Sequence, residues 1–138
     1  TDAIACEGVD AAIARCQRYV EAGADMIFAE AVADPAEYRR FTDAVPVPVL
    51  ANMTEFGKSP LMTVTELAEL NVAMVLYPLS AFRAMSKAAL AVYQTLIADG
   101  TQAAVTDSMQ TREQLYDMLG YKELERQMDQ YLGEQEDV

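Results

Sequence analysis

The chain contains no histidine and no tryptophan, and among its 138 residues only two are cysteines and ten are lysine or arginine. Protein zinc sites are built mainly from cysteine and histidine. Because the chain has no histidine and only Cys6 and Cys16, ten residues apart, no zinc site is expected. No apolar run approaches the roughly 18 residues that cross a bilayer, and no signal peptide is expected. Glycine-rich phosphate-binding motifs and internal repeats are also absent, which leaves nucleotide binding without support.

Positive charge is scarce as well, because 22 acidic residues give a formal net charge of −12. Such a surface repels phosphate backbones and anionic lipids, so neither nucleic acid nor a membrane is an expected partner. Cys16 falls on the apolar side of a predicted helix and is expected to be buried. Reduced thiols are typical of a cytoplasmic protein. In this acidic background the few arginines become candidates for binding an anionic substrate.

What the sequence does contain is an alternation of helices with short apolar strands. Strands are predicted at 24–29, 47–51 and 72–77, and helices at 8–22, 34–44, 63–70 and 80–98. Capping boxes mark two helix starts, at Asp34 and Thr63. Two more helices, at about 110–119 and 121–132, have no strand between them. The pattern predicts an α/β fold with parallel strands, either an open sheet or part of a (β/α)8 barrel, because three strands cannot close a barrel.

Polar side chains follow two of these strands where each one ends. Glu30 follows the first strand, and Asn52 and Thr54, which project to the same side when extended, follow the second. Side chains at the carboxyl ends of parallel strands face the active site in α/β enzymes. The alternatives are a solvated glutamate and local turn bonding by asparagine and threonine.

Two arginines extend this set of candidates. Arg83 lies one turn into the helix that follows the third strand, and Arg112 lies near the start of a later helix. A guanidinium group binds carboxylates with two parallel hydrogen bonds, although many helical arginines are simply solvated. With Glu30 and Asn52, the arginines indicate a site for a small polycarboxylate.

Longer motifs carry a family resemblance over nearly the whole chain. On these motifs the chain resembles the C-terminal half of the 2-methylisocitrate lyase family, in the isocitrate lyase and phosphoenolpyruvate mutase superfamily. The matching segments are 1–3, 7–13, 19–24, Ala-Asn-Met-Thr-Glu-Phe-Gly at 51–57, Tyr-Pro-Leu-Ser-Ala-Phe-Arg-Ala-Met at 77–85, and Met-Gln-Thr-Arg at 109–112.

The resemblance implies a (β/α)8 barrel of the TIM type. The three strands would be its sixth, seventh and eighth, so that residues 1–100 form part of the barrel and residues 101–138 a C-terminal helical extension. The C-terminal helices would swap between subunits of a homo-oligomer, expected to be a tetramer.

The resemblance also implies an activity, the Mg²⁺-dependent cleavage of 2-methylisocitrate into pyruvate and succinate in propionate catabolism by the methylcitrate cycle. Glu30 would be a catalytic residue that orients the substrate hydroxyl, and it would also bind substrate. The other substrate-binding positions implied are Asn52, Met53, Thr54, Arg83 and Arg112. Their partner would be a small di- or tricarboxylate.

Several parts of the family's site have no counterpart in this sequence. The metal-binding aspartates and the Lys-Arg-Cys-Gly-His loop with its catalytic cysteine belong to the N-terminal half of the barrel. No metal ligand is therefore expected among the 138 residues. That half is an expected partner, and the 138 residues alone are expected to be inactive and prone to associate. The alternatives are a phosphonomutase-like or oxaloacetate-cleaving member of the superfamily, or a non-catalytic helical module for oligomerisation.

Overall fold

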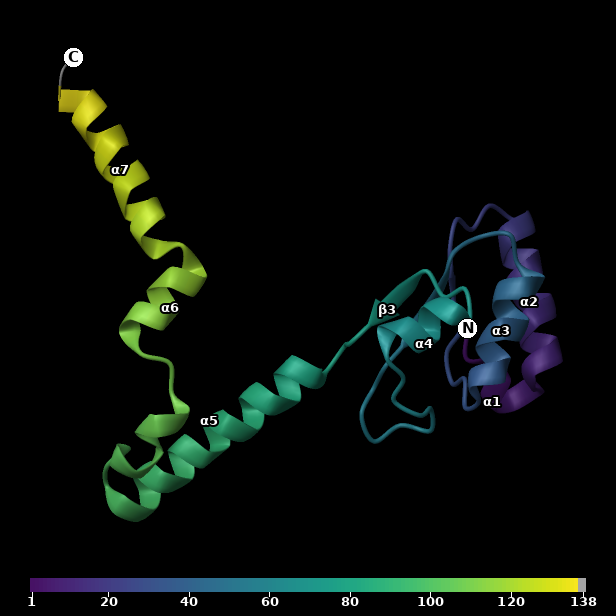
Figure 1. Ribbon diagram of the computed structural model, residues 1–138, viewed down its shortest axis with the longest axis horizontal. Helices are drawn as coiled ribbons and strands as arrows, with labels where there is room; N and C mark the ends of the chain where they lie inside the picture. Colours follow the sequence, from purple (N-terminus) through teal and green to yellow (C-terminus); the bar gives the residue numbers. More distant parts are fainter. Residues whose placement is uncertain (137–138) are drawn as a thin grey trace. The chain divides into compact units, whose positions relative to one another are not determined.

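The structure is a computed structural model that describes residues 1–136, and it divides into two compact units, Thr1–Ser86 and a second unit that begins at Lys87. Figure 1 shows the elements in chain order. They are α1 Ala3–Glu7, α2 Val9–Glu21, β1 Ile27–Phe28, α3 Pro35–Ala44, β2 Val49–Asn52, α4 Val64–Glu69, β3 Met74–Leu76, α5 Ser80–Asp99, the 3-10 helix η1 Ala103–Ser108, α6 Arg112–Leu119 and α7 Tyr121–Glu136.

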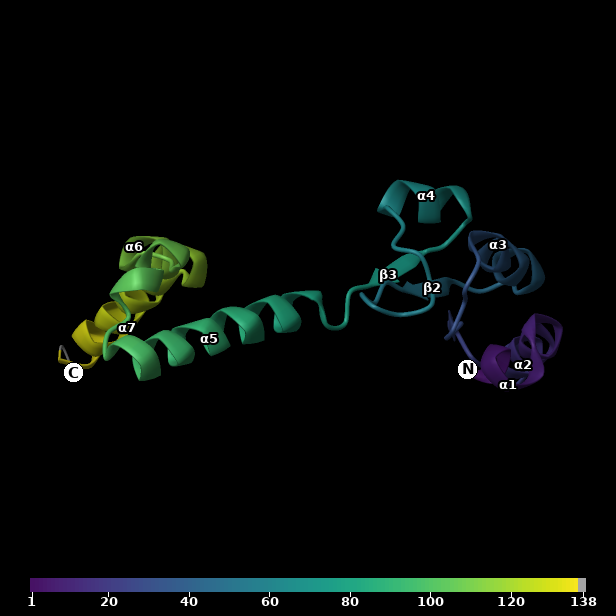
Figure 2. The same cartoon turned by 90° about the horizontal axis from the view of Figure 1, so that it is seen from below.

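The first unit is built on a three-stranded parallel sheet in the order β1-β2-β3. Ile27 pairs with Val49, and Leu50 pairs with Met74 on the other side of β2. Helices connect consecutive strands, as parallel pairing requires, and Figure 2 shows α4 to one side of β2 and β3. The α/β class with parallel strands, which the alternation predicts, is confirmed.

One face of this sheet packs against helices. Helix α3 contacts β2, and α2 contacts α3 in turn. Along β2 the burial alternates, with Val49 and Ala51 buried and the residues between them half-buried. The largest fully buried side chains of the core come from helices, strands and loops alike: Tyr38, Phe41, Met53, Leu67, Val32, Val49 and Cys16. The predicted burial of Cys16 is confirmed, since its exposure is 0%.

Local capping fixes where α3 and α4 begin. The Asp34 side chain accepts from the Ala36 amide, and Glu37 reaches back to the Asp34 amide. Thr63 and Glu66 form the same reciprocal pair at α4. Each pair satisfies amide groups that the first helical turn leaves without a partner, so both predicted helix starts are confirmed.

Other boundaries differ from the sequence-based expectations. The strands predicted at 24–29 and 72–77 shorten to Ile27–Phe28 and Met74–Leu76, because an apolar run predicts burial while a strand also needs a paired neighbour. Helices α1 and η1 were not predicted. Both are one or two turns long, too short to show a hydrophobic period.

The second unit consists of helices only within its described residues. From Lys87 to Gly133 no residue is buried, and large apolar side chains such as Ile97 are exposed, here to 86%. The rings of Tyr116 and Tyr121 stack at 4.5 Å between centroids where α6 meets α7. No helix within residues 1–136 is both long enough and apolar enough to span a bilayer.

Candidate active site

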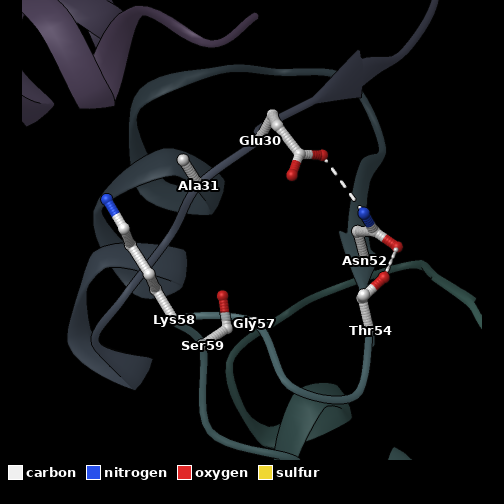
Figure 3. A pocket seen from close by; sticks show the side chains of 7 residues that line it. All are labelled: Glu30, Ala31, Asn52, Thr54, Gly57, Lys58 and Ser59. Carbon is white, nitrogen blue, oxygen red and sulfur yellow. Dashed lines mark hydrogen bonds between the residues drawn. The ribbon is translucent and has the colours of Figure 1, made fainter.

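A hollow of about 230 Å³ lies beyond the carboxyl ends of β1 and β2, within the first unit. Glu30 follows β1 by two residues, and Asn52 is the last residue of β2. Figure 3 shows the residues that line the hollow: Glu30, Ala31, Asn52, Thr54, Gly57, Lys58 and Ser59. Both sequence-predicted strand ends therefore contribute to one cavity.

Asn52 is held from both sides by the two other polar residues predicted with it. Its Nδ2 donates to Glu30 Oε2 at 3.2 Å, and its Oδ1 accepts from Thr54 Oγ1 at 3.2 Å (Figure 3). These two bonds define which end of the amide is nitrogen and which is oxygen. The second amide N–H, the other Glu30 oxygen and the lone pairs of the Thr54 hydroxyl remain for a ligand. The arrangement offers both donors and acceptors to a hydroxylated carboxylate.

Met53 lies between these residues in sequence but faces the other way. Its side chain is only 2% exposed and belongs to the core. The Met53 amide donates to the Leu76 carbonyl at 2.8 Å, and its sulfur accepts from the Met62 amide at 3.5 Å. Alternation along extended backbone thus sends Asn52 and Thr54 to the hollow and Met53 into the core.

A buried tyrosine lies beside the main chain of Asn52. Tyr38 of α3 is buried, and its pKa is raised, chiefly by desolvation and further by the nearby charge of Glu30, while the Asn52 main chain opposes the shift. A neutral phenol therefore persists there. The Glu30 amide donates to the Thr1 carbonyl at 3.1 Å, which ties the end of β1 to the segment before α1.

One wall of the hollow is the loop that follows β2. Ser59 donates from its hydroxyl to the Val32 carbonyl, which joins this loop to the segment after β1. Lys58 lies on the opposite side of the hollow from Asn52 (Figure 3) and forms no salt bridge with any described residue. Ala31 and Phe56 have φ of 62° and 63°, a left-handed conformation that L-residues other than glycine adopt at a cost.

Arg83 does not line the hollow in this structure. Its Nη1 donates to both the main-chain carbonyl and the Oε2 of Glu55, each at 2.8 Å. The guanidinium carbon lies 5.5 Å from the centre of the Phe56 ring. Ser80 Oγ also donates to the Glu55 carboxylate, and this bond, more than Arg83, holds the pKa of Glu55 below its ordinary value. Arg83 thus contacts the loop that forms the wall.

The remaining sequence-predicted residue, Arg112, is the first residue of α6 in the second unit. The structure therefore brings together Glu30, Asn52 and Thr54 in one hydrogen-bonded chain. It does not place Met53 or Arg83 among the lining residues, and Arg112 lies outside the unit that contains the hollow.

Sequence reasoning missed three residues near this site and the hydrogen-bond partners of a fourth. Lys58 and Ser59 stand in a loop whose composition signals only a turn. Tyr38 looks like an ordinary core residue on the apolar side of its helix. Glu55 belongs to the motif at 51–57, but its pairing with Arg83, 28 positions away, has no local signature.

Metal-ligand groups are scarce around the hollow. Within residues 1–136 the structure contains no group of three or more His, Cys, Asp or Glu side chains arranged to hold a metal ion. Among the lining residues Glu30 supplies the single carboxylate. Mg²⁺ prefers an octahedral set of oxygen ligands, so the residues present do not form a magnesium site by themselves.

Comparison with known proteins now identifies the family. Residues 1–97 match the phosphoenolpyruvate phosphomutase family. The chain is 58% identical over 129 residues to the 2-methylisocitrate lyase of Escherichia coli (strain K12), an alignment that covers 94% of this chain and 44% of that protein. The chain thus spans less than half the length of the curated relatives it matches.

Solved structures agree on the fold. A crystal structure of 2,3-dimethylmalate lyase, described as a member of the PEP mutase/isocitrate lyase superfamily, superposes with a TM-score of 0.84 at 25% identity, over 95% of this chain and 46% of that one. Phosphonopyruvate hydrolase in complex with oxalate and Mg²⁺ gives 0.73 at 28% identity, over 94% and 46%. The chain therefore belongs to the phosphoenolpyruvate phosphomutase family, within which it is a homologue of the 2-methylisocitrate lyases.

Proposed function

We propose that this chain is part of a carbon–carbon lyase that cleaves 2-methylisocitrate into pyruvate and succinate in propionate catabolism. The observation that carries the proposal is the chain of hydrogen bonds Glu30–Asn52–Thr54 in the hollow, in a chain 58% identical to a 2-methylisocitrate lyase. The strands would be the sixth to eighth of a (β/α)8 barrel, formed by residues 1–100. The two unpaired thiols suit a cytoplasmic enzyme.

Each residue then has a chemical role. Glu30 would accept a hydrogen bond from the substrate hydroxyl and orient it while the hydroxyl proton passes to a base outside these 138 residues. The resulting alkoxide would become the carbonyl of pyruvate as the carbon–carbon bond breaks. The bonding electrons would pass to the succinate portion, which would take a proton from an acid that also lies outside these residues. Asn52 and Thr54 bind the carboxylate of that portion, where negative charge develops. Met53 contributes through its place between them, since its side chain is buried.

The arginines would supply fixed positive charge. Arg83 has guanidinium nitrogens beyond the Nη1 that binds Glu55, and we propose that they bind a substrate carboxylate. Arg112, in the second unit, stays a proposed substrate-binding residue. Mg²⁺, present with oxalate in the phosphonopyruvate hydrolase structure, would be held by residues outside these 138. Because this chain does not supply the metal site, the 138 residues alone would release no pyruvate.

A chimera gives a direct test. The segment of the Escherichia coli enzyme that aligns with this chain is replaced by the chain, and pyruvate release from 2-methylisocitrate is measured with Mg²⁺. We expect activity in the chimera and its near-complete loss on Glu30→Gln, a substitution that keeps the shape of the side chain. A folded chimera that does not cleave 2-methylisocitrate but cleaves oxaloacetate or phosphonopyruvate would refute the proposal that 2-methylisocitrate is the substrate. It would favour the superfamily alternatives.

A second candidate function rests on a different observation. Because no residue from Lys87 to Gly133 is buried, the helices of the second unit expose much apolar surface. A helix-swapped tetramer would cover it, and the helices within residues 80–132 would then act mainly in assembly. Analytical ultracentrifugation tests this: the 138-residue chain should associate with rising concentration, and a monomer at every concentration would contradict it.

A further inference from the structure

Glu55 lies at the junction of two loops that follow neighbouring strands. It comes three residues after the end of β2, and its carboxylate accepts from Ser80 and Arg83, both at the start of α5 after β3. Arg83 binds the main-chain carbonyl of Glu55 as well, at 2.8 Å. The loop after β2 is therefore bonded to α5 through both its side chain and its backbone.

This connection is well placed to determine the shape of the hollow. The residues directly after Glu55 and Phe56 are Gly57, Lys58 and Ser59, which form one wall. The far end of that wall is anchored by Ser59, whose hydroxyl binds the Val32 carbonyl. Without the Glu55 carboxylate, the near end of the wall would keep only the bond from Arg83 to the Glu55 main-chain carbonyl.

The backbone in this stretch needs such support. Phe56 has φ of 63° and a side chain that is 96% exposed, so burial of its ring contributes little to holding this conformation. The guanidinium of Arg83 lies over the ring at 5.5 Å and bonds to the preceding carbonyl. Exposure of the Arg83 and Glu55 side chains is 36% and 26%, so the pair is partly shielded from water, which favours charge-assisted hydrogen bonds.

We infer that Glu55, hydrogen-bonded to Ser80 and Arg83, is a positioning residue that holds the wall formed by residues 57–59 in its ligand-binding shape. Glu55 does not line the hollow itself. It acts through the wall that it anchors and through the orientation of Arg83. The inference rests on the proposed function only for the identity of the ligand, since the bonds exist without one.

Backbone ¹⁵N relaxation of the 138-residue chain tests the positioning directly. In Glu55→Ala we expect the order parameters of the amides of residues 56–59 to fall from rigid values of about 0.85 to below about 0.6, since charge-assisted bonds are lost. Glu55→Gln, which keeps an acceptor oxygen, should fall between the two. Glu69→Ala is the matched control, because Glu69 is an exposed glutamate of the same unit and its side chain has no bond to this loop. Unchanged order parameters at 56–59 in Glu55→Ala would overturn the inference.

The consequence for binding is measured separately, by titrating succinate and following the Asn52 side-chain amide by NMR. We expect Glu55→Ala to weaken succinate binding about tenfold, with β2 amides as protected as in the wild type and in Glu69→Ala. Equal affinity despite a loosened wall would also overturn the positioning role. If the wild type binds no succinate while the wall still loosens in Glu55→Ala, the proposed substrate fails and the structural inference stands.

Discussion

Met53 offers a sharp test of which side chains act on the ligand and which hold the fold. The family resemblance places it among substrate-binding positions, while the structure buries its side chain in the core at 2% exposure. If burial is its role, then Met53→Ala should destabilise the first unit and Met53→Leu should not. Both variants should leave succinate affinity nearly unchanged under conditions where they are folded.

The expected magnitude follows from the packing. Burying a methionine side chain contributes roughly 1.5–3 kcal/mol, and truncation to alanine adds the cost of the cavity, for a total of about 2–5 kcal/mol. A unit of 86 residues has about 4–13 kcal/mol of stability at ordinary values per residue. Met53→Ala therefore removes a large share of that free energy. Met53→Leu keeps the volume and should cost less than about 1.5 kcal/mol.

Because the chain has two units, a single global transition is an unsafe measure of this effect. Hydrogen exchange of the Leu50 and Ala51 amides in β2 reports on the first unit alone. Urea denaturation should give the same order of stability, with the wild type first, Met53→Leu second and Met53→Ala last. The reasoning is refuted if Met53→Ala loses succinate affinity while its stability stays within about 0.5 kcal/mol of the wild type. That result would mean that the side chain leaves the core to contact the ligand.

Three further predictions concern single interactions. The pKa of Glu55 is lowered by its bonds, so the stabilisation that Glu55 gives is complete above the ordinary pKa of 4.5 and is lost as the pH falls through the lowered pKa. The order parameters of the 56–59 amides should therefore fall below pH 4.5, and Glu55→Gln should abolish that transition. Thr63→Ala removes the cap of α4 and should cost about 1 kcal/mol, seen as faster exchange at Glu66, whereas unaltered exchange would contradict the capping assignment. Gly57→Ala would place a Cβ 3.3 Å from the Thr54 carbonyl oxygen, so it should weaken succinate binding with little loss of stability, and wild-type affinity would show that the wall adapts.

How much of the structure could be predicted from the sequence depended on how far apart in the chain the interacting residues lie. The starts of α3 and α4 are encoded within four residues, at Asp34–Glu37 and Thr63–Glu66, so local pattern was sufficient. The meeting of Glu30 with Asn52 followed from a general rule about strand ends. The pairing of Glu55 with Ser80 and Arg83 depends on how two loops fold back on each other, and no spacing rule covers it.

Some predictions concern matters beyond the structure itself. The roles of Glu30, Asn52, Met53, Thr54, Arg83 and Arg112, the barrel, the helix swap and the boundary between residues 1–100 and 101–138 stay predictions. The helix swap is hard to predict for a physical reason. An apolar helix face such as that of α5, which is not buried within this chain, has the same sequence pattern whether it packs within one chain or against another.

The two left-handed residues beside the hollow, Ala31 and Phe56, have a consequence for attempts to engineer this protein. Glycine adopts their backbone conformation without strain, so a selection for heat resistance should enrich Ala31→Gly and Phe56→Gly early. The same exchanges would give the free loops more conformations to lose when a ligand arrives. Selection for thermal stability would then favour glycine at these two positions, and selection for tight binding would favour the present residues. Sequences selected for one property would lose some of the other.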